Sequence, residues 1–230
     1  MPGQQLRLSI PTEPPRALPA RLVPMRPSTG VAPFDDPAYL FEPWWPGVRT
    51  LAFVEGGRMH LQAEGLTDAD AAFDELADEV PQQLLTDGVV LDGTLLVLDR
   101  AGRLAPHLLR ERMASAAHAG RPAFVASDLL WSDGRSWTRR PYVARRERLT
   151  SVLIEGDRCV VGRAYRTDGT LLAEALAALG IDAISARRLD ARYRFVADEA
   201  WLRIPIRASE DVAVRPSLAL IQRLPLADPS

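Results

Sequence analysis

The feature that most constrains the fold is a series of strand-length apolar segments, each followed by residues that favour tight turns. β-Branched and large apolar residues are frequent in these segments, as in strands that pack on a core. Glu55-Gly56-Gly57 and residues 99–102 (Asp-Arg-Ala-Gly) are typical of hairpin connections, so consecutive strands are predicted to pair. The predicted strands are Val48–Glu55, Arg58–Ala63, Gly88–Leu91, Thr94–Asp99, Pro122–Ser127, Asp157–Arg163, Ala183–Arg187 and Trp201–Ile206.

Helical periodicity appears between these strands. Apolar residues recur at three- and four-residue spacing in Asp68–Val80, Ala105–Ala119 and Leu171–Leu179, which predicts amphipathic helices. Thr67 is the expected N-cap of the first helix, and Pro141–Leu153 is predicted to form a fourth helix with a basic exposed face. This order of hairpins and helices favours an α+β fold, with helices packed on antiparallel sheets, over a doubly wound parallel sheet.

Length and composition predict one globular domain with short extensions. The chain has 230 residues and a net charge of −2, so it can bury a sizeable core and is not coated in basic residues. Recurring prolines predict a flexible tail over residues 1–17. Cys159 is the single cysteine, and no long apolar run resembles a signal peptide or a membrane span. We expect a bacterial cytoplasmic protein without membrane contact.

The basic side chains are unusual because all 28 of the lysine and arginine residues are arginine. Asparagine is absent as well. Lysine and asparagine share codons that begin with two adenines, so a GC-rich genome accounts for a general replacement of lysine by arginine. The same bias does not account for a lysine replaced by tryptophan.

Such a replacement occurs in Tyr39–Phe53, which resembles the first motif of ATP-dependent DNA ligases, Glu-x-Lys-x-Asp-Gly-x-Arg. Glu42, Gly47 and Arg49 match this motif, and Trp44 stands at the position of the family's lysine nucleophile. The resemblance implies that an amine at this position attacks the α-phosphorus of ATP and carries AMP covalently. An indole has no such lone pair, so adenylation at Trp44 is chemically excluded and no catalytic residue is assigned.

Two later segments resemble further motifs of the same family, in the same order. Leu91–Asp99 is similar to Leu-Asp-Gly-Glu-Leu-Val-Val-Leu-Asp, with Thr94 in place of the glutamate expected near the ribose and the metal. Val125–Arg135 is similar to the block that contains Phe-Asp-Leu-Leu, with Ser127 where an aromatic residue would stack on adenine. Loss of such stacking removes ~1 kcal/mol from nucleotide binding. We expect no cofactor; ATP and Mg²⁺ are expected only if the chain is an enzyme.

Near the C-terminus, Gly180–Tyr193 is similar to the family's Gly-x-Glu-Gly-Val-Val-x-Lys-Arg, and residues 201–205 to its Trp-x-Lys-x-Lys strand. In the family these lysines hold the α-phosphate. Arginine also binds phosphate, although its planar fork differs in geometry from a compact ammonium. If nucleotide or phosphate binding is retained, the resemblance assigns it to Glu42, Arg49, Asp182, Arg187 and Arg203.

The resemblance extends from about residue 18 to residue 206. It implies that residues 18–206 have the adenylation-domain fold of ATP-dependent DNA ligases, an ATP-grasp-like fold. Residues 207–230 are expected to form a C-terminal extension that is too short for the family's oligonucleotide-binding domain. Because the changes fall on the nucleophile, the metal-side carboxylates and the adenine stacker, the resemblance in fold exceeds the resemblance in activity.

Arginines cluster in two places that are candidates for DNA binding. The run 135–148 interleaves arginines with Trp137 and Tyr142. The second group, which includes Arg188 and Arg192, lies beside the former active-site cleft if the family fold holds. The first cluster is either a face that follows a phosphate backbone or a solvated helix face with local ion pairs. The candidates are Arg135, Arg139, Arg140, Arg145, Arg146, Arg188 and Arg192.

No metal site is predicted. His60, His107 and His118 share no metal-ligand spacing with one another or with the acids. With Thr94 in place of a glutamate, the acids of the family's cleft under-supply Mg²⁺. These acids are Asp92, Asp128 and Asp182.

Three functions remain in view. The first is a DNA ligase-like pseudoenzyme that binds or scaffolds in DNA repair, with DNA, an active DNA ligase or another repair protein as its partner. The second is a divergent ligase or nucleotidyltransferase with residual activity, and the third is a protein-interaction subunit of an intact ligase. Trp44 and Trp45 either fill the vacated pocket or offer an aromatic platform for a base.

Overall fold

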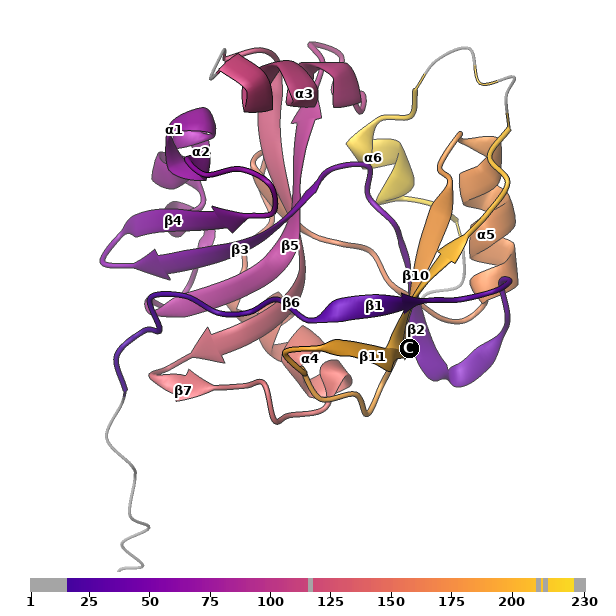
Figure 1. Ribbon diagram of the computed structural model, residues 1–230, viewed down its shortest axis with the longest axis horizontal. Coiled ribbons are helices and arrows are strands. Elements are labelled where there is room, and N and C mark those ends of the chain that lie inside the picture. Colours follow the sequence, from indigo (N-terminus) through magenta and orange to yellow (C-terminus); the bar gives the residue numbers. More distant parts are fainter. Residues whose placement is uncertain (1–15, 116–117, 210–211, 213–214, 226–230) are drawn as a thin grey trace, which may run out of the picture.

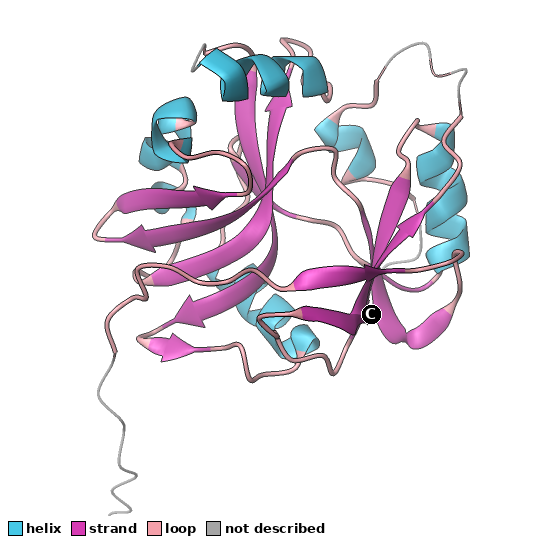
Figure 2. Cartoon of the chain, in the orientation of Figure 1, coloured by secondary structure: helices cyan, strands magenta, loops and turns pink. Residues whose placement is uncertain are grey.

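The structure, a computed structural model, describes residues 16–115, 118–209, 212 and 215–225. Nearly all of the predicted tail over residues 1–17 therefore lies outside the described residues. The chain folds into a six-stranded and a five-stranded sheet, with helices arranged around both (Figures 1 and 2). None of the helices in the described residues is long and apolar enough to cross a membrane.

The six-stranded sheet has the strand order β4-β3-β5-β6-β7, and β8 pairs with β6 outside this path. Strand β5 (Val89–Leu98) is buried along its length except at the half-buried Thr94, because both faces of this strand are covered. The strands are β3 (Val48–Glu55), β4 (Arg58–Ala63), β5 (Val89–Leu98), β6 (Arg121–Ser132), β7 (Arg135–Ser136) and β8 (Cys159–Val161). All of them come from one continuous stretch of the chain.

The five-stranded sheet has the strand order β1-β11-β10-β2-β9, so its strands come from both ends of the chain. Its strands are β1 (Arg26–Thr29), β2 (Asp36–Pro43), β9 (Tyr165–Thr167), β10 (Ala183–Arg188) and β11 (Ala197–Pro205). The central pairing places Glu42 of β2 opposite Ser185 of β10, and Arg187 of β10 opposite Trp201 of β11. Residues from three of the segments that resemble ligase motifs therefore lie side by side.

The helices cover the sheets on their outer sides. The first two pack against β4, α3 packs against β5, α4 packs against β6, and α5 packs against β2 and β10. In the predicted C-terminal extension, Leu218 and Ile221 of α6 join an apolar cluster that the five-stranded sheet shares with β5 and β6 of the six-stranded sheet. The helices are α1 (Ala69–Ala72), α2 (Asp74–Glu79), the 3₁₀ helix η1 (Pro81–Gln83), α3 (Pro106–Ser115), α4 (Tyr142–Val152), α5 (Gly169–Ala178) and α6 (Leu218–Ile221).

A separate apolar cluster joins the two sheets. It contains Leu51 and Phe53 of β3 together with Met25, Tyr193 and Trp201 from the segments of the five-stranded sheet. Its buried side chains pack β3 against the segments that carry Met25, Tyr193 and Trp201. Buried side chains from both sheets therefore hold the sheets together beside the cleft.

The α+β prediction is confirmed, with differences in the details. Pairing in the described residues is antiparallel except for β1 with β11 and β6 with β8, which are parallel. The predicted strands Gly88–Leu91 and Thr94–Asp99 form the single strand β5 because the intervening residues continue its pairing. The predicted helix Asp68–Val80 is interrupted at Phe73 by a non-helical φ of −136°. The turn at residues 99–102 leads into α3 and not into the next strand.

Candidate functional site

A small cavity of about 70 Å³ lies between the two sheets, where β2 ends and β3 begins. It is lined by β5 and β6 from the six-stranded sheet and by β10 and β11 from the five-stranded sheet. Its walls include Glu42, Trp44, Arg49, Thr94, Ser127 and Arg187. The segments that resemble ligase motifs therefore converge on one place.

Trp44 closes one side of this cavity. Its backbone amide donates a hydrogen bond to the carbonyl oxygen of Ala183 at 3.2 Å, which holds it directly after β2. Its half-buried ring centroid lies 6.2 Å from that of Trp201, and the guanidinium carbon of Arg203 lies 5.3 Å from the same ring. Trp45 is buried in the apolar cluster that the two sheets share. This packing favours pocket filling over an open aromatic platform.

Arg49 and Asp92 form a bidentate ion pair at the cavity wall. Arg49 Nη2 lies 2.6 Å from Asp92 Oδ2, and Arg49 Nε lies 3.1 Å from Asp92 Oδ1. The Tyr193 hydroxyl donates to Asp92 Oδ2 at 2.8 Å, and Arg49 Nη1 donates to the carbonyl oxygen of Met25. Burial, reinforced by Asp92, raises the pKa of Tyr193 well above its ordinary value. Both Asp92 oxygens are therefore engaged by internal donors.

Asp128 on β6 is the centre of a second buried network. Arg145 Nε and Nη2 each donate to its carboxylate at 2.7 Å, and Arg187 Nη1 donates at 2.9 Å. The Arg187 guanidinium lies between two rings, 4.4 Å from Tyr142 and 4.1 Å from Trp201. Burial lowers the pKa of Arg187, but Tyr142 and Asp128 raise it above its ordinary value overall, so Arg187 stays charged.

Arg187 also presents an unsatisfied donor. Its buried Nε has no hydrogen-bond partner among the described residues, and its side chain lines the cavity. A buried donor of this kind is costly unless water or a ligand accepts its hydrogen bond. The cavity thus retains one feature of a binding site for a small polar group.

A third network ties α4 to β2. Glu42 accepts hydrogen bonds from the Tyr142 hydroxyl at 2.9 Å and from Arg146 Nη1 at 2.8 Å. Arg146 Nη2 also donates to the carbonyl oxygen of Gly162 at 2.6 Å. Burial raises the pKa of Tyr142 above its ordinary value; the charge of Arg187 opposes this rise and the charge of Glu42 adds to it. Glu42 therefore has a structural partner and is not free to bind a sugar or a phosphate.

The cleft does not fit ATP with Mg²⁺. Its volume of about 70 Å³ is several times smaller than the roughly 300–1,000 Å³ of ordinary ligand pockets. Ser127 offers no aromatic face and Thr94 no carboxylate. Asp92 and Asp128 are buried, and each already accepts at least three hydrogen bonds from internal donors. In the described residues, the cleft thus lacks both the space and the free carboxylates that the family's cofactors require.

The candidate phosphate-binding residues separate into two groups. Three of them line the cavity: Glu42, Arg49 and Arg187. The other two, Asp182 and Arg203, do not line it and form an ion pair in which Arg203 Nη2 and Asp182 Oδ1 are 3.6 Å apart. Asp182 is 73% exposed and lines a second cavity of about 280 Å³ that also touches Trp44. The structure therefore does not bring all five residues to one ligand.

Arg145 is buried and Arg146 is largely buried, which contradicts their assignment to DNA binding. Arg145 is 0% exposed, and it donates to Asp128 and to the carbonyl oxygens of Arg140 and Ala191. The side chain of Arg146 is only 11% exposed. Their charges are compensated inside the protein, so these two arginines stabilise the packing of α4 and do not face a DNA backbone.

The remaining DNA-binding candidates are exposed: Arg135, Arg139, Arg140, Arg188 and Arg192. Arg139 and Arg140 stand just before α4. Arg188 is bound to Asp190, with nitrogen–oxygen distances of 3.0 and 2.8 Å. Arg192 lines a wide groove of about 1,030 Å³ along β1 and β11. The exposed arginines are therefore spread over two regions of the surface.

The sequence did not reveal two features of the described residues. Tyr142 and Tyr193 act as hydrogen-bond donors to cleft carboxylates, a role that no motif signalled. Far from the cleft, His118 lies near Asp74 and Glu75, although these residues share no metal-ligand spacing in the sequence. Contacts between distant segments carry no local signal, so only the folded chain shows them.

Comparisons with known proteins agree with this geometry. The sequence model of the family described as "ATP dependent DNA ligase domain" matches residues 23–193. This chain belongs to that family. The ligase domain of LigD from Mycobacterium tuberculosis superposes with a TM-score of 0.66 at 27% identity, covering 79% of this chain and 58% of that one. A mycobacterial DNA ligase D described as complexed with ATP and MES superposes with a TM-score of 0.65 at 26% identity, covering 80% of this chain and 60% of the other.

Curated relatives include DNA ligase C1 of Mycolicibacterium smegmatis, 29% identical over 199 residues, or 81% of this chain and 55% of the relative. Another is the multifunctional non-homologous end joining protein LigD of the same organism, 26% identical over 200 residues, or 86% of this chain and 26% of the relative. The chain thus spans about half of the first relative and about a quarter of the second. The adenylation-domain fold implied by the sequence motifs is confirmed.

Proposed function

We propose that this chain is a non-catalytic member of the ligase family that binds DNA or a repair protein and does not join strands. The observation that carries the proposal is Trp44, which takes the position of the lysine nucleophile and packs beside Trp201 and Arg203. An indole there cannot form the covalent AMP adduct on which the family's chemistry depends. The arginine-paired acids of the cleft support the same conclusion.

Exposed arginines support a DNA partner. Arg135 lies in β7, and Arg139 and Arg140 lie in the loop between β7 and α4. Their charges have no carboxylate partner among the described residues. Unpaired surface arginines bind phosphates and release counterions, which gives affinity without sequence preference. We therefore assign DNA contacts to this loop and not to Arg145 or Arg146.

The relatives support a setting in DNA repair. One of them is named as a non-homologous end joining protein, and the two from Mycolicibacterium smegmatis are bacterial. Together with the lack of a membrane-crossing helix in the described part of the chain, this supports a role in the bacterial cytoplasm. An intact ligase or another repair protein is then a natural partner.

The first experiment tests catalysis directly. The purified protein is incubated with α-labelled ATP and Mg²⁺, denatured, and examined for covalent label, with an active ligase of the family as the positive control. We expect no label, because Trp44 supplies no nucleophilic amine. Label on this chain, together with sealing of a nicked duplex that Arg49→Ala abolishes, would establish the divergent-ligase alternative in its place.

The second experiment tests DNA binding. Affinity for a nicked and an unbroken duplex is measured across a salt series for the wild type, for an Arg139→Ala/Arg140→Ala variant and for Arg110→Ala, an exposed arginine on α3. Removing one arginine–phosphate interaction reduces the slope of log affinity against log salt by about 0.9. We expect the double variant to bind more weakly and with a shallower slope, while Arg110→Ala keeps both the affinity and the slope. Equal affinities in all three proteins would refute the assignment to this loop.

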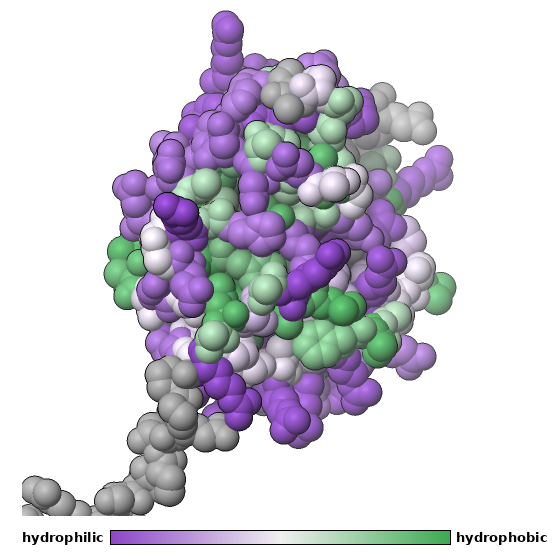
Figure 3. Space-filling model, turned by 60° about the vertical axis from the view of Figure 1, so that its left-hand side comes forward, coloured by the Kyte–Doolittle hydropathy of each residue, from purple (hydrophilic) through white to green (hydrophobic). Residues whose placement is uncertain are grey.

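One observation favours a protein partner as the second candidate. Leu85 and Ile154 are 66% and 55% exposed and lie on adjoining segments, joined by hydrogen bonds from Leu85 to Val152 and from Ile154 to Gln83. Apolar residues also reach the surface shown in Figure 3 among mostly hydrophilic ones. If no DNA binds at low salt, a protein scaffold is the function that remains.

A further inference from the structure

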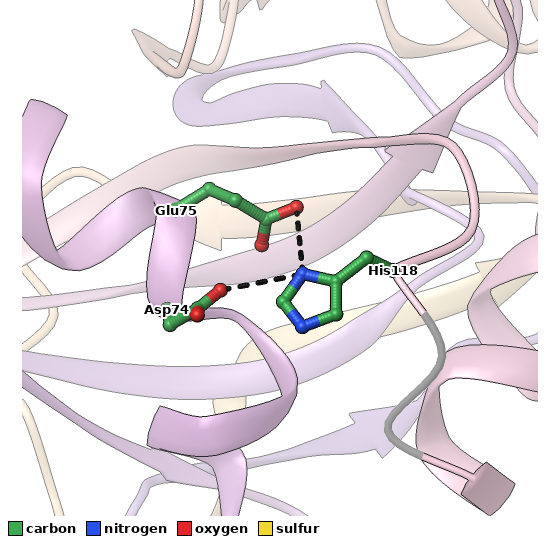
Figure 4. A group of neighbouring side chains, drawn as sticks. All are labelled: Asp74, Glu75 and His118. Atoms are coloured by element: carbon green, nitrogen blue, oxygen red, sulfur yellow. Dashed lines mark ion pairs between the residues drawn. The ribbon is translucent and has the colours of Figure 1, made fainter.

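A group of potential metal ligands lies at the far side of the six-stranded sheet, outside the cleft. Asp74 and Glu75 occupy the first turn of α2, and His118 lies in the segment between α3 and β6. Ligand atoms of all three side chains lie within 4.8 Å of one another. Figure 4 shows the His118 ring facing both carboxylates, with the two ion pairs ending on the same ring nitrogen.

The two separations that involve His118 match those between ligands of one metal ion. His118 Nδ1 lies 3.5 Å from Asp74 Oδ1 and 3.5 Å from Glu75 Oε1. A direct N–H···O hydrogen bond would bring each pair to about 2.7–3.2 Å. Two ligands that share a tetrahedral zinc ion at about 2.0–2.2 Å from each are separated by roughly 3.4 Å. His118 Nδ1 is thus spaced from each of the two carboxylates as ligands of one metal ion are.

Buried Arg112 of α3 holds this arrangement in place. It donates to Glu75 Oε2 at 2.7 Å and to Glu75 Oε1 at 3.0 Å, and its Nη1 reaches the carbonyl oxygen of Ala72 at 2.9 Å. The same guanidinium donates at 3.2 Å to the carbonyl oxygens of Ala119 and Gly120, directly after His118. One side chain therefore orients a ligand and fixes both ligand-bearing segments.

The ligand atoms are also accessible to a cation. Arg112 donates one hydrogen bond to each carboxylate oxygen of Glu75. Each of its oxygens keeps a lone pair beside the one given to Arg112. Asp74 and His118 are 59% and 53% exposed, so an ion can reach them from solvent.

We propose that Asp74, Glu75 and His118 form a binding site for a divalent transition-metal ion of the zinc class. One imidazole and two carboxylates are a common ligand set for such ions, with water in the remaining positions, whereas Mg²⁺ prefers oxygen ligands alone. The bound ion would join α2 to the segment that leads into β6. This site is separate from the ligase-like cleft, and its role is structural.

The test is a calorimetric titration of the metal-free full chain with Zn²⁺ and, separately, with Mg²⁺. The variants are Asp74→Asn and His118→Ala, with His60→Ala as the matched control because His60 pairs with a single carboxylate, that of Asp70, at 2.5 Å. Glu75 is left intact because its loss would strand buried Arg112. Each variant's thermal midpoint without metal is measured first to establish that it folds.

We expect the wild type and His60→Ala to bind one Zn²⁺ per chain and to gain thermal stability with it. Asp74→Asn and His118→Ala should each lose at least tenfold in affinity and lose the thermal shift, and Mg²⁺ should not compete. Addition of Co²⁺ should give a visible absorption band that His118→Ala abolishes. Equal Zn²⁺ affinity in wild type and His118→Ala, or no binding by the wild type, would overturn the proposal.

Discussion

Replacing Arg145 by methionine separates the structural and DNA-binding interpretations of the arginine run. The change removes two hydrogen bonds of 2.7 Å to buried Asp128 and leaves the carbonyl oxygens of Arg140 and Ala191 without their donor. Breaking a buried ion pair from one side costs about 3–5 kcal/mol. Asp128 keeps its 2.9 Å bond to Arg187, which places the expected loss near 3 kcal/mol.

The assay is urea denaturation followed by tryptophan fluorescence, with thermal unfolding as a second measure. A loss of about 3 kcal/mol lowers the melting temperature by roughly 6–12 °C in a domain of this size. The control is Arg139→Met, because Arg139 is exposed and its replacement should change stability by less than about 0.5 kcal/mol while weakening DNA binding. A loss below about 1 kcal/mol for Arg145→Met, with DNA binding reduced instead, would refute the buried-network assignment.

Three further results are expected. Gly93→Ala should destabilise the fold by about 1–3 kcal/mol in denaturant titrations, because the added Cβ would lie 2.3 Å from the carbonyl oxygen of Val125; an unchanged midpoint would contradict this. Cys159 should react with a thiol reagent at pH 8 only as fast as the protein opens, since burial raises the pKa of its thiol; immediate labelling would show an open β8. Glu75 has a pKa of about 2 in the folded protein against 4.5 when unfolded, which adds stability that is complete above pH 4.5 and lost as the pH falls toward 2. Glu75→Gln should therefore flatten the plot of stability against pH between 4.5 and 2. An unchanged slope would show that the contact with Arg112 does not cause this pH dependence.

The sequence predicted the fold class because its strand and helix signals are local. Val48–Glu55 and Arg58–Ala63 are hairpin strands with the predicted bounds, since Gly56 and Gly57 adopt the positive φ values that this turn needs. Strand β2 was missed because Asp36–Pro43 contains proline at its second and last positions and shows no alternation. Its pairing with β10, almost 150 residues later, is a tertiary effect.

The site was predicted only where the motifs themselves carried it. The position of Trp44 was visible from its neighbours, and the cavity walls confirmed that the motifs converge. A run of arginines carries no information about which members are buried, because burial depends on acids as far away as Glu42 and Asp128. The same limit hid the approach of His118 to α2.

The two sheets differ in how soon each can be completed as the chain leaves the ribosome. The six-stranded sheet uses only residues 48–161, so it can assemble as soon as that stretch has emerged. β1 and β2 are made first but must wait for β9, β10 and β11, the last of which ends at Pro205. Pairings of such long sequence separation form slowly. The cleft at Trp44 is therefore assembled last, and a stalled or truncated chain would expose two unpaired strands beside an already folded half.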